Sequence, residues 1–174
     1  MRLTRPVFRA HNPRWSWAPD SGAGAAAAGG RFNPVGTPAL YTSLRLETAW
    51  LEAQQAFPFK AQPMTICAYD VDCAGMLDLT NPAVLQENCV APSDLSCPWE
   101  DLHLRGQLPP SWRLARRLIA AGISGILVPS FAAGAGRSDV NVVFWKWAAD
   151  PPHQVRAVDD FGRLPRDSKS WEES

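Results

Sequence analysis

Proline is the residue that most constrains how this chain can fold. Sixteen prolines are spread along 174 residues. A proline inside a helix removes a backbone hydrogen bond and clashes with the preceding turn, so long helices are excluded wherever prolines are frequent. Only residues 44–57 and 111–121 combine freedom from proline with a helical pattern of apolar residues. The remainder of the chain is expected to form short strands, turns and loops.

Short runs of β-branched and aromatic residues indicate strands. They predict strands at residues 6–10, 38–42, 64–71, 123–128, 140–147 and 154–158, with a short helical turn at 81–88. The segments 21–30, rich in glycine and alanine, and 91–110, rich in proline, are expected to be loops. Strands distributed along a chain with few helices favour an α+β fold over a doubly wound parallel sheet. We therefore expect a compact, mixed or antiparallel β-sandwich core in a single domain over residues 1–165, followed by a polar tail over 166–174.

Each predicted helix has a serine before its first apolar residue. Ser43 and Ser111 are candidate N-caps, and Gly122 is placed to end the second helix. Glu52 falls at the edge of the apolar face of the first helix, where a carboxylate can reach a cleft. That face is formed by Leu46, Ala49, Trp50, Ala53 and Phe57.

Charge and cysteine spacing exclude several classes of protein. Lysine plus arginine equals aspartate plus glutamate, at 17 each, whereas nucleic-acid-binding proteins are normally basic. No apolar run reaches the roughly 18 residues of a membrane span, and the N-terminus lacks a secretory pattern, so we expect a cytoplasmic protein. Neither a metal site nor a disulfide framework is expected, because no C-x-x-C pair occurs among Cys67, Cys73, Cys89 and Cys97.

Several short motifs occur together in one order along the chain. They are FRAH at 8–11, GGRFNP at 29–34, ALYTS at 39–43, ETAWLE at 47–52, DV at 70–71, LDLT at 77–80, GILVPS at 125–130 and NVV at 141–143. In this order they resemble the RES domain family, over roughly residues 6–165. By motif match, the arginine, glutamate and serine that give this family its name are Arg31, Glu52 and Ser130.

The resemblance implies a fold and a function. RES proteins have a fold similar to ADP-ribosyltransferases and consume NAD+ as a substrate. They are usually the toxins of bacterial toxin–antitoxin pairs, neutralised by an Xre-type antitoxin. The resemblance thus implies an NAD+-dependent ADP-ribosyltransferase, or an NAD+ glycohydrolase or phosphorylase, that arrests growth. The acceptor of the ADP-ribose stays open among water, phosphate and a host protein such as an enzyme of nucleotide synthesis. The resemblance implies contact with nucleic acid only through the antitoxin.

The chemistry of NAD+ cleavage suits the residues at these positions. Nicotinamide leaves from a ribose carbon through an oxocarbenium-like state, and a nearby carboxylate stabilises the positive charge. Glu52 is the candidate for this role, the alternative being an ordinary exposed helix glutamate. Arg31 follows two glycines and could hold the pyrophosphate through paired hydrogen bonds, with Arg9 and Arg137 as competitors.

Further polar and aromatic residues are candidates for contacting NAD+. Tyr41 could stack on nicotinamide or ribose, or be a core tyrosine with a bonded hydroxyl. Ser130 follows a buried strand without a nearby base, so we expect it to form a hydrogen bond with the ribose or the nicotinamide amide rather than to act as a nucleophile. Asn141 could act similarly, and His11 could contact the ligand or serve the structure.

A second class of function stays open. Arg113, Arg116 and Arg117 lie opposite the apolar face of the 111–121 helix. This helix could make the chain a non-enzymatic RNA- or protein-binding module, although a solvated helix face is the preferred explanation of the pattern. Release of nicotinamide from NAD+ distinguishes an enzyme from a binding module.

Overall fold

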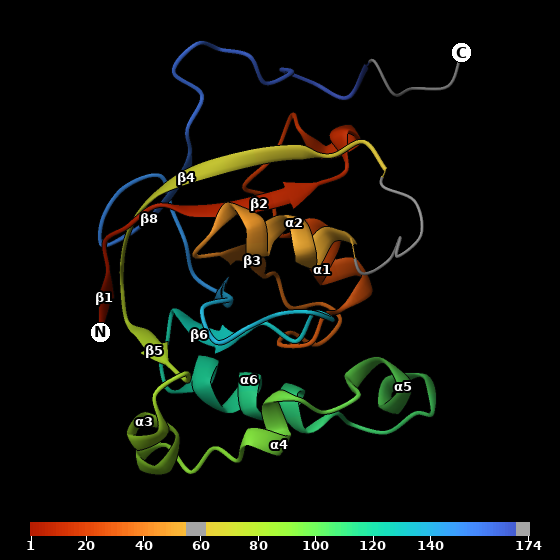
Figure 1. Ribbon diagram of the computed structural model, residues 1–174, viewed down its shortest axis with the longest axis vertical. Helices are drawn as coiled ribbons and strands as arrows, with labels where there is room; N and C mark the ends of the chain where they lie inside the picture. The colour runs from red at the N-terminus through yellow and green to blue at the C-terminus, as the bar shows by residue number, and fades with distance from the viewer. Residues whose placement is uncertain (55–61, 170–174) are drawn as a thin grey trace.

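A single curved sheet of eight strands forms the centre of the protein (Figure 1). The computed structural model describes residues 1–54 and 62–169. The strand order is β1-β4-β2-β3-β7-β6-β5, and β8 pairs with β4. All pairs are antiparallel except β5 with β6. The strands are β1 Arg2–Leu3, β2 Val7–His11, β3 Leu40–Ser43, β4 Thr65–Ala74, β5 Met76–Asp78, β6 Gly125–Pro129, β7 Val140–Phe144 and β8 His153–Ala157.

The two ends of this strand order come together, so the sheet nearly closes on itself. The amide of Met76 at the start of β5 donates to the carbonyl of Met1 over 3.0 Å. The terminal ammonium of Met1 donates to the carbonyl of Met76 over 2.7 Å. Gly75 makes the sharp turn between β4 and β5 with a φ of +76°, which favours glycine. The expected α+β class with a mostly antiparallel sheet is therefore confirmed.

Helices cover the sheet as short segments, as the proline content requires. Figure 1 shows α3 to α6 gathered at one end of the molecule, below β5 and β6, with α2 beside β2 and β3. The helices are α1 Ala23–Ala28, α2 Leu46–Gln54, α3 Pro82–Glu87, α4 Pro92–Leu95, α5 Trp99–Leu104 and α6 Pro110–Ala120, with a 3-10 turn at Pro13–Trp15. The predicted end of the first long helix at Phe57 lies outside the described residues.

Alternating side chains of the central strands enter two apolar clusters. Val142 and Phe144 of β7 belong to one cluster with Leu40 and Tyr69. Val143, between them, belongs to the other cluster with Leu114 and other residues of α6. Successive side chains of a strand point to opposite faces, so β7 packs on both sides and is buried in the middle of the molecule.

Two segments expected to be loops contain helices. Residues 23–28 form α1 because alanine has the highest helix propensity, and Gly29 ends this helix with a φ of +74°. In the 91–110 segment the prolines start helices rather than prevent them. Pro92 and Pro110 occupy the first helical turns of α4 and α6, where no amide hydrogen bond is lost.

The expected helix starts and the apolar face of the first helix also need correction. Ser43 is the last residue of β3, and the N-cap of α6 is Pro109 rather than Ser111. Leu46 and Trp50 are exposed, whereas Thr48 and Ala49 are buried. Small residues at this face let α2 approach β2 and β3 closely, and this tertiary fit determines which face is buried.

The expected end of α6 agrees with the structure. Gly122 follows the C-cap with a φ of +80°, and the amide of Ile123 donates back to the carbonyl of Leu118. All four cysteines are free thiols. Across residues 1–54 and 62–169, no helix is long and apolar enough to cross a membrane.

Candidate functional site

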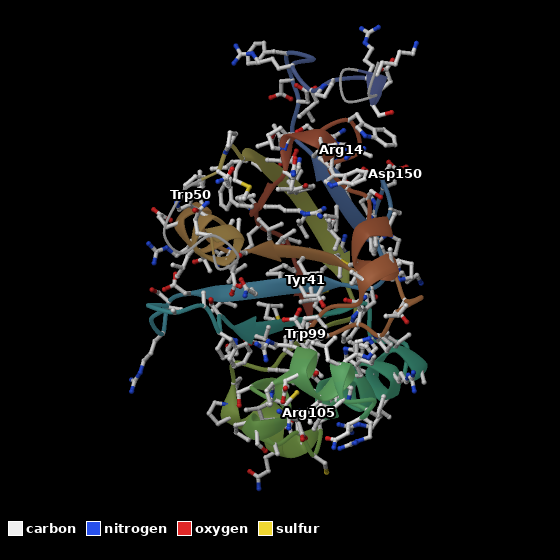
Figure 2. All side chains as sticks on the ribbon, turned by 90° about the vertical axis from the view of Figure 1, so that its right-hand side faces the viewer. Arg14, Tyr41, Trp50, Trp99, Arg105 and Asp150 are labelled. Carbon is white, nitrogen blue, oxygen red and sulfur yellow. The ribbon has the colours of Figure 1, made fainter. Side chains whose placement is uncertain are left out.

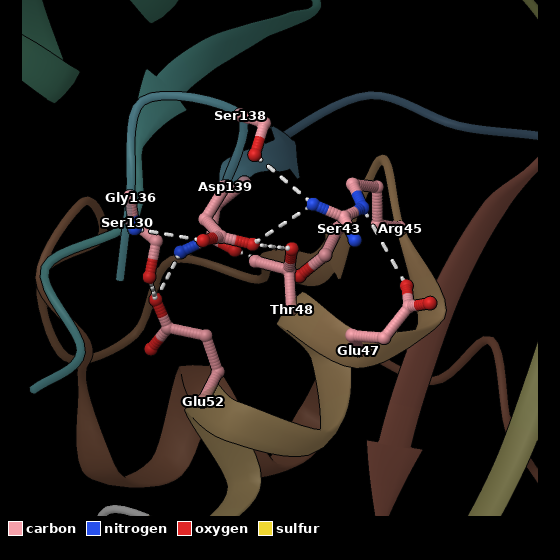
Figure 3. A network of polar contacts seen from close by, with 10 residues as sticks. Ser43, Arg45, Glu47, Thr48, Glu52, Ser130, Gly136, Ser138 and Asp139 are labelled. Atoms are coloured by element: carbon pink, nitrogen blue, oxygen red, sulfur yellow. Dashed lines mark hydrogen bonds and ion pairs between the residues drawn. The ribbon is translucent and has the colours of Figure 1, made fainter. Parts of the chain in front are cut away.

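The carboxylate of Glu52 accepts hydrogen bonds from two side chains of other elements, and Figure 3 shows the contact with Ser130. The Ser130 hydroxyl donates to Oε1 of Glu52 over 2.5 Å. The Asn141 amide nitrogen donates to the same oxygen through a short hydrogen bond. Glu52 comes from α2, Ser130 directly follows β6, and Asn141 lies in β7. Tertiary structure therefore joins three residues that the sequence separates by up to 89 positions.

Both donors are oriented by further hydrogen bonds. The Ser43 hydroxyl donates to Oδ1 of Asn141 over 2.7 Å, which directs the amide nitrogen of Asn141 toward Glu52. The Ala132 amide donates to Ser130 Oγ over 3.2 Å, which leaves the Ser130 hydroxyl hydrogen for Glu52. Hydrogen bonds to a carboxylate are stronger than neutral ones, and this arrangement fixes one carboxylate oxygen in place.

Two cavities meet at this carboxylate. Their volumes are about 330 Å³ and about 500 Å³, within the range of small-molecule sites. Tyr41, Glu52 and Asn141 line both of them. The smaller cavity is otherwise lined by residues 8–10 of β2, residues 42 and 43 of β3 and two alanines of α2. The larger is otherwise lined by Arg31, Phe32, Trp99, Glu100, Phe131 and Val143.

Arg31 enters the larger cavity from the segment after α1. Its Nη1 donates to the carbonyl of Cys97 over 2.6 Å, and its guanidinium lies 4.8 Å from the centre of the Phe131 ring. Among the described residues, no acceptor is bonded to Nε or Nη2, so these donors remain for a ligand. Burial lowers the pKa of Arg31, while nearby groups that include Cys97 and Glu52 oppose this effect. An arginine stays charged in proteins, so the cavity contains a fixed cation.

Tyr41 is a wall of both cavities and a structural support of the segment that carries Arg31. Its hydroxyl donates to Asn33 Oδ1 over 2.7 Å and accepts from the Phe32 amide over 2.9 Å. Burial raises the pKa of Tyr41 well above its ordinary value, which keeps the hydroxyl protonated as a donor. Figure 2 shows Tyr41 near the middle of the molecule, with Trp99 on the helical layer below it.

Two tryptophans complete the support of this segment. Trp112 of α6 donates to the carbonyl of Gly30 over 2.7 Å, and Trp145 donates to that of Phe32 over 2.8 Å. A Cβ on Gly30 would lie 2.6 Å from the Tyr41 hydroxyl, so the backbone passes too close for any larger residue. The glycine at position 30 therefore lets the backbone pass close to Tyr41 and does not mark a mobile loop.

Arg9 and His11 come from the same strand but lie in different surroundings. Arg9 lines the smaller cavity, and its Nη1 donates to the Pro19 carbonyl over 2.8 Å. His11 lines neither cavity. It is buried, and its Nε2 lies 3.4 Å from the Ser16 hydroxyl. Arg137, the other competitor for the phosphates, is exposed and also lines neither cavity. A contact between His11 and a ligand stays a prediction that this placement does not favour.

Sequence reasoning missed several residues of the site. The sequence pattern predicts a helix cap at Ser43. In the structure Ser43 lies opposite Asn141 in the pairing of β3 with β7. Trp99, Glu100 and Phe131 line the larger cavity but come from segments without a recognisable pattern. Only the pairing of strands and the packing of α5 bring them to the cleft. In the described part of the chain, no three His, Cys, Asp or Glu side chains are placed to hold a metal ion.

Comparison with known proteins identifies relatives of this fold. The model of the RES domain matches residues 6–167. A chain of the crystal structure of the M. tuberculosis MbcT–MbcA toxin–antitoxin complex is similar, with a TM-score of 0.62 and 20% sequence identity. The similarity covers 91% of this chain and 84% of that one, and at this identity it shows the shared fold. No curated protein matches the chain in sequence.

The buried imidazole of His11 predicts a pH dependence of stability. Burial and the nearby charge of Arg9 lower the pKa of His11 to about 4, from an ordinary value of 6.5. Between these values the unfolded chain binds a proton that the folded protein excludes, so the free energy of unfolding falls as the pH falls. We expect a loss of about 2 kcal/mol from this group between pH 7.5 and pH 5.

Urea unfolding at the two pH values measures this loss. The variant His11→Gln should lose about 2 kcal/mol less than the wild-type protein between them. His103→Gln, which leaves His11 in place, is the control and should keep most of the loss. An equal loss in wild type and His11→Gln would show that His11 is not held neutral.

Proposed function

Because the chain belongs to the RES domain family, we propose that it is an enzyme that cleaves the nicotinamide–ribose bond of NAD+. The observation that carries this proposal is the place of Glu52. Its carboxylate lies where two cavities meet, fixed by Ser130 and Asn141. A dinucleotide has two halves joined at a charged pyrophosphate, and two neighbouring cavities that share three lining residues and each contain an arginine suit such a ligand.

The proposed reaction breaks one bond and forms another at the same ribose carbon. The electron pair of the C–N bond goes to the nicotinamide nitrogen, which becomes neutral, and positive charge develops on the sugar. Glu52 stabilises that charge with a carboxylate that is already oriented by Ser130 and Asn141, so little reorganisation is needed in the transition state. An acceptor oxygen or nitrogen then attacks the carbon and loses its proton. The acceptor is water, phosphate or a protein side chain.

Arg31 is proposed to bind the pyrophosphate. Its Nη1 is anchored on the Cys97 carbonyl and its guanidinium lies over Phe131, so the charge is held in one orientation before the ligand binds. The donors that face no protein acceptor can then form paired hydrogen bonds with phosphate oxygens. Arg9 is the corresponding cation of the smaller cavity. Tyr41 is proposed to contact nicotinamide or ribose with its ring, since its hydroxyl is already bonded to Asn33.

The alternative of a binding module has weaker support. Two of the three arginines on α6 are used within the protein: Arg113 donates to the Leu108 carbonyl and Arg117 to that of Asn88. These bonds orient the two side chains but leave their charges in place, as the bond from Arg31 to the Cys97 carbonyl does. Three exposed arginines on one helix of a chain with zero formal net charge are a narrow basis for a nucleic-acid surface, whereas the cleft offers a built site.

The biological role is proposed to be that of a toxin in a bacterial toxin–antitoxin pair. The MbcT–MbcA structure is a toxin–antitoxin complex with a shared fold, which supports a protein partner for this chain. An enzyme that consumes NAD+ or modifies an essential protein must be silenced in its own cytoplasm. We propose an Xre-type antitoxin that covers the cleft and excludes NAD+.

Glu52→Gln tests the role of the carboxylate. Glutamine keeps the size and the accepting oxygen for Ser130 and Asn141, but it removes the charge that faces the oxocarbenium. We expect nicotinamide release from NAD+ to fall by about a hundredfold or more in turnover. Glu87→Gln, an exposed change on α3, is the matched control and should keep wild-type turnover. A folded Glu52→Gln protein with near-normal turnover would contradict the assignment.

Arg31→Lys tests the paired hydrogen bonds to phosphate. Lysine keeps the positive charge but lacks the planar fork, so NAD+ should bind about tenfold or more weakly. Calorimetric titration with NAD+ measures the affinity in the Glu52→Gln background, where turnover is suppressed. Arg113→Lys on α6 is the control for replacing a bonded arginine and should leave the affinity unchanged. Wild-type affinity in Arg31→Lys would exclude the phosphate role.

Expression in a bacterial host tests the proposed role as a toxin. Induction of the wild-type chain alone should stop growth and lower cellular NAD+ or modify a host protein, whereas equal expression of Glu52→Gln should not. Co-expression of an Xre-type antitoxin should restore growth. A folded wild-type protein that leaves growth unaffected at high expression would contradict this role.

A further inference from the structure

The segment 130–139, between β6 and β7, delivers both donors to Glu52. Ser130 begins this loop, and Asn141 follows it by two residues. Most of its middle is exposed, and Gly134 adopts a φ of +85°. Small residues and glycines give a loop many accessible conformations. The Ser130–Glu52 hydrogen bond therefore requires that something else hold the loop against α2.

Asp139 occupies the position where the loop is closed. Its backbone carbonyl accepts from the Ser130 amide over 2.7 Å, which joins the two ends of the loop. Its carboxylate Oδ2 accepts from the Gly136 amide over 2.8 Å, which fixes the glycine-rich part. Asp139 thus connects the beginning, the middle and the end of the segment that carries Ser130.

The other carboxylate oxygen of Asp139 is bonded to the helix that carries Glu52 (Figure 3). The Thr48 hydroxyl donates to Asp139 Oδ1 over 2.5 Å. Thr48 is fully buried, and it lies four residues before Glu52, on the same face of α2. Arg45 adds a weaker contact, with its Nη1 at 3.9 Å from Asp139 Oδ1 and 3.0 Å from the Ser138 hydroxyl.

We infer that Thr48 and Asp139 are positioning residues that hold Ser130 and Asn141 in hydrogen-bonding contact with Glu52. The helix then contacts the loop at two places one turn apart: Thr48 with Asp139, and Glu52 with Ser130. Neither Thr48 nor Asp139 lines either of the two cavities that meet at Glu52, so neither is expected to touch a dinucleotide. Their effect on the reaction passes through the orientation of Glu52, and this inference rests on the proposed NAD+ cleavage.

The hydrogen bonds of Asp139 also keep its carboxylate ionised. The Thr48 hydroxyl and the Gly136 amide, with the charge of Arg45, lower the pKa of Asp139 below its ordinary value. A charged acceptor strengthens the bond from Thr48. The contact is therefore suited to hold the loop at any pH at which NAD+ cleavage would be measured.

Thr48→Val is the variant that tests the inference. Valine has nearly the shape of threonine but lacks the hydroxyl, so the bond to Asp139 is lost without a cavity. We expect kcat for nicotinamide release to fall by about tenfold to a hundredfold, because small displacements of an aligned group have effects of this size. The KM for NAD+ should change by less than about twofold, since the cavity walls are intact. Thr48→Ser, which restores the hydroxyl, should recover most of kcat.

The chain offers a matched control for loss of a threonine–aspartate hydrogen bond. The Thr80 hydroxyl donates to Asp78 Oδ1 over 2.6 Å, beyond the end of β5 and away from the cavities. Thr80→Val should leave kcat and KM unchanged. Equal losses of kcat in Thr48→Val and Thr80→Val would indicate general destabilisation and contradict the inference.

Hydrogen–deuterium exchange gives a readout that does not depend on activity. In Thr48→Val, the amides of residues 130–139 should exchange at least severalfold faster than in the wild-type protein, whereas those of β7 should not change. Asp139→Asn, at a partly accessible position, should accelerate the exchange of the same amides. It replaces Thr48→Val as the test if that variant fails to fold. Unchanged exchange in folded Thr48→Val would overturn the inference.

The two readouts separate this inference from the proposed function. If the wild-type protein released no nicotinamide, the proposed function would be contradicted. Faster amide exchange in Thr48→Val would then still support the contact between α2 and the loop. Wild-type turnover in a folded Thr48→Val protein, with NAD+ cleavage intact in the wild type, would overturn the positioning role alone.

Discussion

The antiparallel pairing of β3 with β7 is the interaction on which the site depends. In this register Ser43 lies opposite Asn141 and Tyr41 lies opposite Val143. A shift by one residue would turn Asn141 away from Glu52 and place Val142 at the cleft, because side chains alternate between the faces of a sheet. The register is protected by burial, since Val142, Val143 and Phe144 are each fully enclosed in one of the two apolar clusters.

The polar groups of the cleft are arranged in two layers around the paired strands β3 and β7. Glu52, Arg31 and Tyr41 face the cavities, and each is held by a further group: Ser130 and Asn141 for Glu52, the Cys97 carbonyl for Arg31, and Asn33 for Tyr41. Buried polar groups that are fully bonded make a structure rigid and specific. A site prepared in this way needs little rearrangement when charge develops on a substrate.

Tryptophan and proline have clear roles in building the cleft. Trp112 and Trp145 use their indole N–H groups to hold the backbone of residues 30–32, while their rings remain in apolar surroundings. Pro98 is the N-cap of α5, whose residues Trp99 and Glu100 line the larger cavity. A chain with short elements thereby obtains a rigid cavity, because side-chain donors bond backbone groups that no strand or helix uses.

The sequence by itself determined the class of the fold and supplied the candidates for the site residues. Strand runs and the lack of long proline-free segments predicted a mostly antiparallel α+β protein, and ordered motifs pointed to Glu52, Arg31, Tyr41, Ser130 and Asn141. Only the tertiary structure decided how these residues meet. Local patterns misplaced the caps, because β3 continues to Ser43 and α6 begins at Pro110, before Ser111. They misplaced the buried face of α2, because packing against β2 and β3 outweighs helix propensity. The contacts of Ser43 with Asn141 and of Thr48 with Asp139 join residues more than 90 positions apart. Such contacts follow from strand register and loop closure, which no local pattern encodes.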